Sequence, residues 1–415
     1  MRVVVIGAGI AGTSTAYYLA RDGHEVTVVD RHGAAAQETS FANGAQLSYS
    51  YVAPFAGPDV PAKLPFWLLN PSAPARFSPS ADPAQWRWVL SFLMACTREA
   101  SDRTTRDLLS LSFLSRSLMA AFLAEEPDVA FDHAPTGKLI VHSDAAGFES
   151  AKRQMDYQAS LGCEQEALDR AACLTLEPAL AALGERIVGG IFTRSEATAD
   201  CRKLCEGLAA AVLRQGGRFR YNADVTGFVR QGERITAVRT SQGEIPADAV
   251  VVAAGTDINA LLRPLGFTLP IHALKGYSVT APMRPGVTPL KISVTDFANK
   301  IVYAPLGGTI RAAGFADISA DPEPSPSRVR QLRRQAMDGF GALADFSGAE
   351  VWCGRRPATP TGRPLLGRSP VANLHLCAGL GGLGFTLGFG AGRLIADLLV
   401  ERPAAIPMDG FRLAA

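Results

Sequence analysis

The chain has 415 residues, of which 47% are hydrophobic and 19% are charged, and its formal net charge is +2. These values exclude an intrinsically disordered protein, and the lack of a basic run or stripe argues against a nucleic-acid partner. Its seven cysteines are odd in number and form no C-x-x-C pair, so we expect neither disulfide bonds nor a metal site.

The first thirty residues contain the parts of a dinucleotide-binding unit. A short β-branched strand is followed by a G-x-G-x-x-G turn, a segment with helical spacing, and a second strand that ends at Asp30. The glycines allow a tight turn and a close approach of a pyrophosphate, and the helix N-terminus offers free N–H groups. Asp30 is placed to accept the ribose hydroxyls. The predicted cofactor contacts in this unit are Gly7, Gly9, Ile10, Ala11, Gly12, Asp30 and Arg31.

Small and amide side chains gather in residues 39–46, after the ribose-binding strand. Such a cluster is also typical of an ordinary turn. FAD extends beyond its adenosine end to a flavin, so it needs further hydrogen-bond donors along its pyrophosphate and flavin. This loop directly follows the ribose-binding strand and could provide them. The candidates are Ser40, Asn43, Gly44, Ala45 and Gln46.

Aromatic residues and seven prolines mark residues 47–79. One interpretation is an ordered surface excursion whose aromatic side chains are buried. The other is an interfacial patch that contacts a membrane surface or a partner, since aromatic side chains favour the headgroup region and a nearby lysine attracts anionic lipid. The residues concerned are Tyr49, Tyr51, Phe55, Phe66 and Trp67, with Lys63 nearby.

The middle of the chain alternates between helical and strand patterns. Residues 85–125 predict two helices with a break near 98–103, and residues 164–176 predict a shorter helix. Asp200 is placed to cap a helix over 201–215. A hairpin follows, and then a continuous apolar strand over 247–254, which is typical of a strand buried on both faces of a parallel sheet. The candidate cofactor contacts here are Val225, Ala254 and Gly255.

Alternating strands return after residue 271, and a last strand opens into a second glycine-rich loop before the C-terminal helix. The N-terminus of such a helix would stabilise negative charge on a reduced flavin, a closing element that NAD-dependent enzymes do not ordinarily need. We therefore expect FAD. The candidate contacts in this loop are Gly382, Leu383, Gly384, Phe385 and Thr386.

This order predicts two discontinuous domains. Residues 1–58, 196–270 and 351–415 form the FAD-binding domain, and residues 59–195 and 271–350 form the substrate-binding domain. The predicted fold class is α/β (α+β overall), with a Rossmann-like FAD-binding domain and an inserted antiparallel-sheet substrate domain.

The motifs, taken together, resemble those of the FAD-dependent amino-acid oxidoreductases, which include D-amino acid oxidase, glycine oxidase and sarcosine oxidase. They are Ala253-Ala254-Gly255, Leu274-Lys275-Gly276-Tyr277, Gly354-Arg355-Arg356-Pro357 and the two glycine-rich loops. The likeness covers almost the whole chain and is greatest for the bacterial D-amino acid dehydrogenases. Two positions depart from the family pattern: Leu380 stands where histidine is common, and Phe385 where tryptophan is frequent.

The resemblance implies oxidative deamination of a D-amino acid to a 2-oxo acid and ammonia, by hydride transfer from the α-carbon to flavin N5. Electrons would pass to a quinone or another acceptor. The alternatives are an oxygen-using amine oxidase of the glycine, sarcosine or hydroxyproline type, and a flavin-binding scaffold without turnover. No apolar stretch reaches a membrane-spanning length, and the apolar run at the N-terminus is the strand of the nucleotide unit rather than a signal peptide, so we expect a cytoplasmic location. The aromatic stretch and the resemblance both point to peripheral association with the inner face of the cell membrane.

Three residues are candidates for contact with the substrate. In the G-x-R-P motif the family uses the arginine, here Arg356, to hold the substrate carboxylate, and a planar guanidinium suits a bidentate contact. Its neighbour Arg355 is better explained by a surface salt bridge. Tyr277 and Tyr303, on predicted strands of the inserted domain, each offer a hydroxyl to the carboxylate or amine, although a buried structural tyrosine is the alternative for both.

Overall fold

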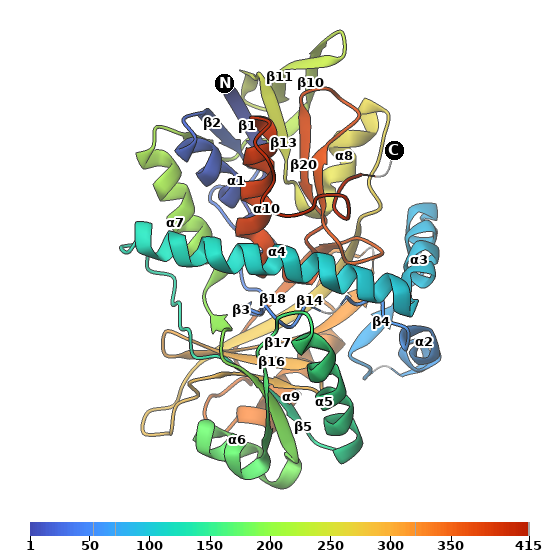
Figure 1. The fold of residues 1–415 in the computed structure, drawn as a ribbon, viewed down its shortest axis with the longest axis vertical. Coiled ribbons are helices and arrows are strands. Elements are labelled where there is room, and N and C mark those ends of the chain that lie inside the picture. Colours follow the sequence, from blue (N-terminus) through green and yellow to red (C-terminus); the bar gives the residue numbers. More distant parts are fainter. Residues whose placement is uncertain (53, 71, 320, 414–415) are drawn as a thin grey trace.

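The computed structural model describes residues 1–52, 54–70, 72–319 and 321–413. Two bodies, each built around a large sheet, lie one above the other in Figure 1, and the long helix α4 (Arg98–Glu125) crosses the molecule between them. The mixed α/β architecture agrees with the predicted fold class.

The first sheet has the strand order β19-β20-β13-β1-β2-β9. Its strands are parallel except for β19, which runs antiparallel to β20. The short β-branched runs form the centre of this sheet because both of its faces are covered. The strands are β1 (Arg2–Ile6), β2 (Glu25–Val29), β9 (Arg218–Arg220), β13 (Ala249–Val252), β19 (Leu365–Arg368) and β20 (Leu374–Ala378).

Alternate residues of β1 point into two different cores. Val3 and Val5 pack in a core shared with α1 (Ile10–Arg21), α7 (Cys201–Arg214) and α10 (Gly384–Leu399). Val4 and Ile6 pack in a second core on the opposite face. That face is covered by the sheet β10 (Val225–Gln231), β11 (Arg234–Thr240) and β12 (Gly243–Pro246), by the helix α8 (Ile258–Leu262), and by the 3-10 helices η2 (Gly255–Asp257) and η3 (Arg263–Leu265).

The first and last helices of the chain, α1 and α10, pack against each other closely. A Cβ atom at Gly392 would lie 2.7 Å from the backbone of Ser14, so this approach requires glycine. The 3-10 helix η4 (Gly381–Leu383) leads into α10. The segment 381–399 and α4 both have the length and hydropathy of membrane-spanning helices, but buried residues of both helices contribute to the same core of the first body.

The second sheet has the order β18-β14-β17-β16-β15-β5-β7-β6, and β4 pairs with β17. Helix α9 (Pro326–Phe340) covers one face: Leu332, Ala336 and Phe340 pack in a core with alternate residues of β14, β16 and β17. The strands are β4 (Ala75–Phe77), β5 (Lys138–His142), β6 (Glu166–Asp169), β7 (Gly189–Thr193), β14 (His272–Pro282), β15 (Ser293–Asp296), β16 (Ile301–Leu306), β17 (Thr309–Ile318) and β18 (Glu350–Ala358).

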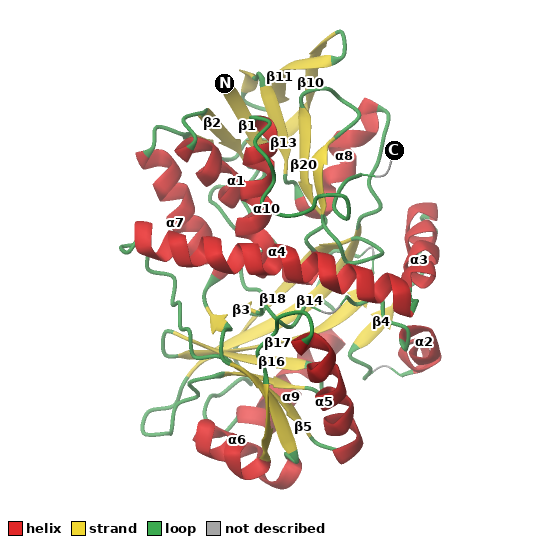
Figure 2. Ribbon diagram, viewed as in Figure 1, coloured by secondary structure: helices red, strands yellow, loops and turns green. Residues whose placement is uncertain are grey.

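The remaining elements join or flank the two bodies (Figure 2). A small antiparallel pair, β3 (Gln46–Leu47) with β8 (Ala197–Thr198), lies where the chain passes between them. Helices α2 (Val60–Leu69) and α3 (Pro83–Ala95) stand at one edge of the molecule. The others are α5 (Ala145–Ala159), α6 (Arg170–Leu176) and the 3-10 helix η1 (Pro178–Arg186).

Three sequence-based boundaries are corrected by the structure. The expected helix over 164–176 begins only at Arg170, because β6 pairs with β7 and Asp169 then caps α6 by accepting from Ala172 N at 2.8 Å. The break in 85–125 lies at residues 96–97, slightly before the predicted one. Finally, β18 pairs along its whole length with β14, so residues 351–358 lie in the second sheet rather than with the FAD-binding segments.

The aromatic stretch 47–79 does not present one patch. Tyr49 is buried in the core of the first body, the Lys138 ammonium lies 4.2 Å from the Tyr51 ring centroid, and Phe55 stacks on Trp67. Of the five aromatic residues only Phe66 is exposed. The predicted interfacial patch is therefore wrong for most of its members: Tyr49 and Tyr51 pack toward the interior, and Phe55 and Trp67 pack in a small core with α3.

Candidate active site

A cavity opens at the carboxyl ends of β1, β2 and β13, which is where parallel α/β sheets bind nucleotides. It extends from the first glycine turn to the C-terminal loop. Its lining includes the predicted residues Gly7, Gly9, Ile10, Ala11, Asp30, Arg31, Ser40, Val225, Ala254, Gly255 and Gly384. The cavity thus gathers contacts that are more than 370 positions apart in the chain.

The turn before α1 is built for an anionic group. The Ser40 hydroxyl accepts from Ile10 N at 3.1 Å and so fixes the 39–46 loop against the helix N-terminus. The helix has no side-chain cap, which leaves first-turn N–H groups free for a pyrophosphate. Gly12 does not line the cavity. A Cβ atom there would overlap the carbonyl oxygen of Gly7, so this glycine maintains the turn itself.

Asp30 is held at the end of β2 by backbone donors. Its Oδ2 accepts from Ala8 N at 2.7 Å and its Oδ1 accepts from His32 N at 2.9 Å. These contacts fix the carboxylate at the cavity wall, and each oxygen retains a lone pair for a ribose hydroxyl. The position fits the adenosine half of FAD.

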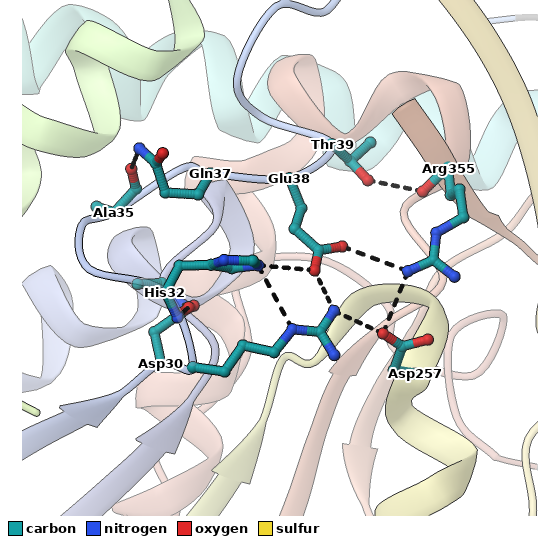
Figure 3. Close-up of polar contacts among 10 residues, drawn as sticks. Asp30, His32, Ala35, Gln37, Glu38, Thr39, Asp257 and Arg355 are labelled. Atoms are coloured by element: carbon teal, nitrogen blue, oxygen red, sulfur yellow. Dashed lines mark hydrogen bonds and ion pairs between the residues drawn. The ribbon is translucent and has the colours of Figure 1, made fainter. Parts of the chain in front are cut away.

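A cluster of alternating charges borders the cavity (Figure 3). Arg31 contacts both Glu38 and Asp257, the second at 2.7 Å. Arg355 lies 3.3 Å from Asp257 and 3.7 Å from Glu38. The cluster joins the loop after β2, the turn after β13, and β18. Arg355 therefore has the salt-bridge role predicted for it, whereas Glu38 and Asp257 were not singled out because no local motif identifies them.

The predicted contacts in the 43–46 loop, and Gly382, Leu383 and Thr386 of the C-terminal loop, do not line the cavity, although Leu380 and Gly384 do. Asn43 Oδ1 accepts from Ala45 N at 3.0 Å, and Gln46 Nε2 donates to Ser293 Oγ. The Thr386 hydroxyl accepts from Ser48 N at 3.0 Å, which joins the two loops. Gly44, Gly382 and Leu383 lie within these same loops.

Behind the 43–48 segment lies a buried ion pair that the sequence did not indicate. Lys138 Nζ donates to Ser48 Oγ at 3.0 Å and lies 3.9 Å from Glu196 Oε2. Glu196 Oε1 accepts from Ser50 N and Tyr51 N at 3.1 and 3.2 Å. Burial lowers the pKa of Lys138 and raises that of Glu196, and each partner opposes the shift of the other. The pair supports the loop that Ser48 joins to α10.

Arg356 extends from β18 toward the same region. Its Nη1 donates to the Phe315 carbonyl at 2.8 Å, and its side chain passes so close to Gly276 that any Cβ there would overlap the guanidinium. Within the described part of the chain no carboxylate lies within ion-pair distance of it. Burial lowers the pKa of Arg356, and Asp317 opposes that shift. A largely desolvated cation without a counter-ion is well suited to receive an anionic ligand.

Arg356 also adjoins the C-terminal loop. Its Cδ would lie 3.6 Å from a Cβ atom at Gly382, and the next residue, Pro357, lines the cavity. An acid bound by this guanidinium would therefore lie beside the cofactor rather than at a separate site.

The two tyrosines do not agree with the predicted substrate contacts. The Tyr277 hydroxyl accepts from Ser325 N at 3.2 Å, and the Tyr303 hydroxyl donates to the Gln335 carbonyl at 3.1 Å. Both rings are buried in the core under α9. Alternation along β14 explains this result, because Ser278, one residue after Tyr277, faces the other body and donates to the Ala42 carbonyl.

The two departures from the family pattern are apolar and buried. Leu380 lines the cavity and also packs in the core of the first body. Phe385 belongs to that core and does not line the cavity. Among the described residues no group of three or more His, Cys, Asp or Glu side chains is arranged to hold a metal ion.

A sequence model of the FAD dependent oxidoreductase family matches residues 2–398. D-amino acid dehydrogenase 2 of Ralstonia nicotianae is 48% identical over 425 residues, with complete coverage of both chains. D-amino acid dehydrogenase of Paramagnetospirillum magneticum is 42% identical, with 99% of this chain and 97% of the relative covered.

Solved structures agree on the fold. Glycine oxidase from Geobacillus kaustophilus superposes with a TM-score of 0.77 at 22% identity, covering 100% of this chain and 98% of that one. L-proline dehydrogenase from P. horikoshii gives 0.76 at 19% identity, covering 99% and 96%. The matching family is described as FAD dependent, and the cavity has the lining expected for that cofactor. The chain belongs to the FAD-dependent oxidoreductase family and is an amino-acid dehydrogenase that uses FAD.

Proposed function

We propose that this enzyme oxidatively deaminates D-amino acids, with Arg356 as the group that binds the substrate carboxylate. The names of the relatives support the substrate class. The observation that carries the proposal is the half-buried guanidinium of Arg356, which lacks a carboxylate partner among the described residues and lies beside the cofactor cavity. Orientation of the α-carbon is the main contribution that a flavin enzyme of this kind requires from its protein.

FAD, when bound, would supply the hydride acceptor for oxidation of the substrate amine to an imine, which water would hydrolyse to a 2-oxo acid and ammonia. The chain's own residues hold the acid. The Phe315 carbonyl engages one nitrogen of Arg356 and fixes the guanidinium plane, so its other nitrogens remain for two carboxylate oxygens. Gly276 leaves the space that the guanidinium occupies.

The test is anaerobic bleaching of the yellow holoenzyme with matched pairs of D- and L-amino acids, together with glycine, sarcosine and both prolines. Bleaching by D-amino acids but not their L-enantiomers supports the proposal. Preferential bleaching by glycine or sarcosine would assign a glycine or sarcosine substrate instead, and an absorbance unchanged by every compound would favour a scaffold without turnover.

We further propose that the electrons pass to a membrane quinone and that the enzyme works peripherally at the cytoplasmic face of the cell membrane. The relatives are named dehydrogenases rather than oxidases, which supports an acceptor other than oxygen. Stopped-flow reoxidation of the reduced enzyme tests this choice. Slow reaction with oxygen and fast reaction with a soluble quinone are expected, whereas stoichiometric peroxide at the turnover rate in air would make the enzyme an oxidase.

A further inference from the structure

Half of the exposed large apolar side chains in the described part of the chain lie at one edge of the molecule. Among the described residues eight large hydrophobic side chains are exposed, and four of them lie between residues 66 and 94. Three form a row at intervals of four on α3: Trp86 is 49% exposed, Leu90 59% and Met94 64%. Phe66 on α2 is 53% exposed. Both helices stand at the same edge in Figure 1.

Helix α3 is apolar on both faces, which its packing against the protein does not explain. The opposite face, with Gln85, Trp88, Phe92 and Ala95, is buried. A surface helix normally carries charged and polar residues on the face away from the core. A contiguous exposed apolar row instead marks a site of interaction with a protein or a membrane.

Two arginines near this row have no acidic partner among the described residues. Arg87 and Arg98 are exposed, and neither forms a hydrogen bond or ion pair with another described residue. Of the acidic residues nearby, Glu99 is paired with Arg103 at 2.7 Å, and Asp82 caps α3 by accepting from Ala84 N at 2.8 Å. An apolar row flanked by free arginines complements an anionic surface with an apolar interior.

Trp86 is oriented as an interfacial anchor. Its indole N–H donates to the Ser80 carbonyl at 2.9 Å, and its ring packs edge-on against Phe77. The ring is therefore held in place while about half of its surface stays open. Tryptophan is enriched at the level of lipid headgroups, and a helix of this length lies in that plane rather than crossing the bilayer.

We infer that the outer face of α3, defined as Trp86, Arg87, Leu90 and Met94 together with Arg98 at the start of α4, docks on a bilayer that contains anionic phospholipid. This inference rests on the proposed membrane quinone acceptor, because docking would bring the reduced enzyme to it. It is distinct from the predicted aromatic patch, of which only Phe66 is exposed beside this face.

The experiment is sedimentation of the FAD-loaded enzyme with phosphatidylcholine vesicles, with or without phosphatidylglycerol. Binding should require the anionic lipid and weaken with salt. Arg87→Gln with Arg98→Gln should weaken binding roughly 30-fold, about fivefold for each arginine, and Leu90→Gln with Met94→Gln should weaken it at least as much. Matched controls are Arg330→Gln and Leu213→Gln, also at exposed positions but on α9 and α7.

A second measurement locates the contact. Brominated lipids should quench tryptophan fluorescence of the wild type, and Trp86→Phe should remove most of that quenching. No vesicle binding by the wild type, or equal binding by α3 variants and controls, would overturn the inference. Loss of self-association rather than of vesicle binding in the α3 variants would make this face a contact between copies. Dye-linked oxidation of a D-amino acid, measured on the same samples, tests the proposed function separately.

Discussion

We expect replacement of Arg356 to impair substrate binding while leaving folding almost unchanged. The guanidinium has one hydrogen bond within the protein, to the Phe315 carbonyl at 2.8 Å, and no carboxylate partner among the described residues. Removing it costs the folded protein little, since an unpaired buried cation contributes no net stability. The substrate carboxylate, by contrast, loses its counter-ion.

The expected loss follows from the burial of that contact. Truncating one partner of a buried, hydrogen-bonded charge pair costs about 2–5 kcal/mol, which corresponds to a decrease in kcat/KM of roughly 30- to 5,000-fold. Arg356→Lys should recover only part of this loss, because an ammonium cannot make the two parallel bonds of a guanidinium. Arg355→Ala should cost less than about 1 kcal/mol, since its ion pairs are partly exposed.

The assay is dye-linked turnover of a D-amino acid, with FAD affinity from flavin fluorescence and Tm from calorimetry. Arg356→Ala should lose activity while FAD affinity and Tm stay close to wild type. Equal effects from Arg355→Ala and Arg356→Ala, or release of FAD by Arg356→Ala alone, would refute the assignment of the carboxylate-binding arginine.

Four further outcomes are expected. Gly12→Ala should yield protein without flavin, measured as the ratio of flavin to protein absorbance, because its Cβ would overlap the Gly7 carbonyl. Arg328→Ala should lower stability to urea by about 3–5 kcal/mol, since it strands the buried Asp317 carboxylate to which it donates at 3.0 and 2.5 Å. Burial lowers the pKa of His375 from 6.5 to about 4, so its contribution to stability is present above pH 6.5 and lost as the pH falls toward 4, and His375→Gln should flatten that part of the profile of Tm against pH. Acid precipitation should release all flavin into the supernatant, since we expect a noncovalent cofactor; colour retained in the pellet would contradict this.

The nucleotide-binding unit could be predicted because its signals are local. A strand, a glycine turn, a helix and Asp30 follow one another within thirty residues, and backbone geometry links each to its task. The G-x-R-P motif likewise predicted a role for Arg356. In contrast, the cluster of alternating charges brings Glu38 together with Asp257 and Arg355, which lie more than 200 residues later in the chain. No local motif in the sequence indicates these contacts.

The predictions that were wrong concern which face of a strand or helix is packed against the rest of the protein. Tyr277 and Ser278 are neighbours on β14, and only the position of α9 decides which of them points toward the other body. The same ambiguity hid the outer face of α3, because its sequence is apolar on both sides. Tyr49, predicted within a surface stretch, became part of the core because the chain turns inward before α2.

The close packing of α1 on α10 determines when the cofactor site can form during synthesis. Residues 7–30 leave the ribosome well before the rest of the site, yet the side of α1 that faces α10 has no partner until residues 384–399 have been made. The segment that follows the 39–46 loop also lacks a contact until then, because Ser48 N donates to the Thr386 hydroxyl. Flavin is therefore expected to bind only after residues 384–399 have been made, and until then the nascent chain exposes the α10-facing side of α1, a surface that favours aggregation.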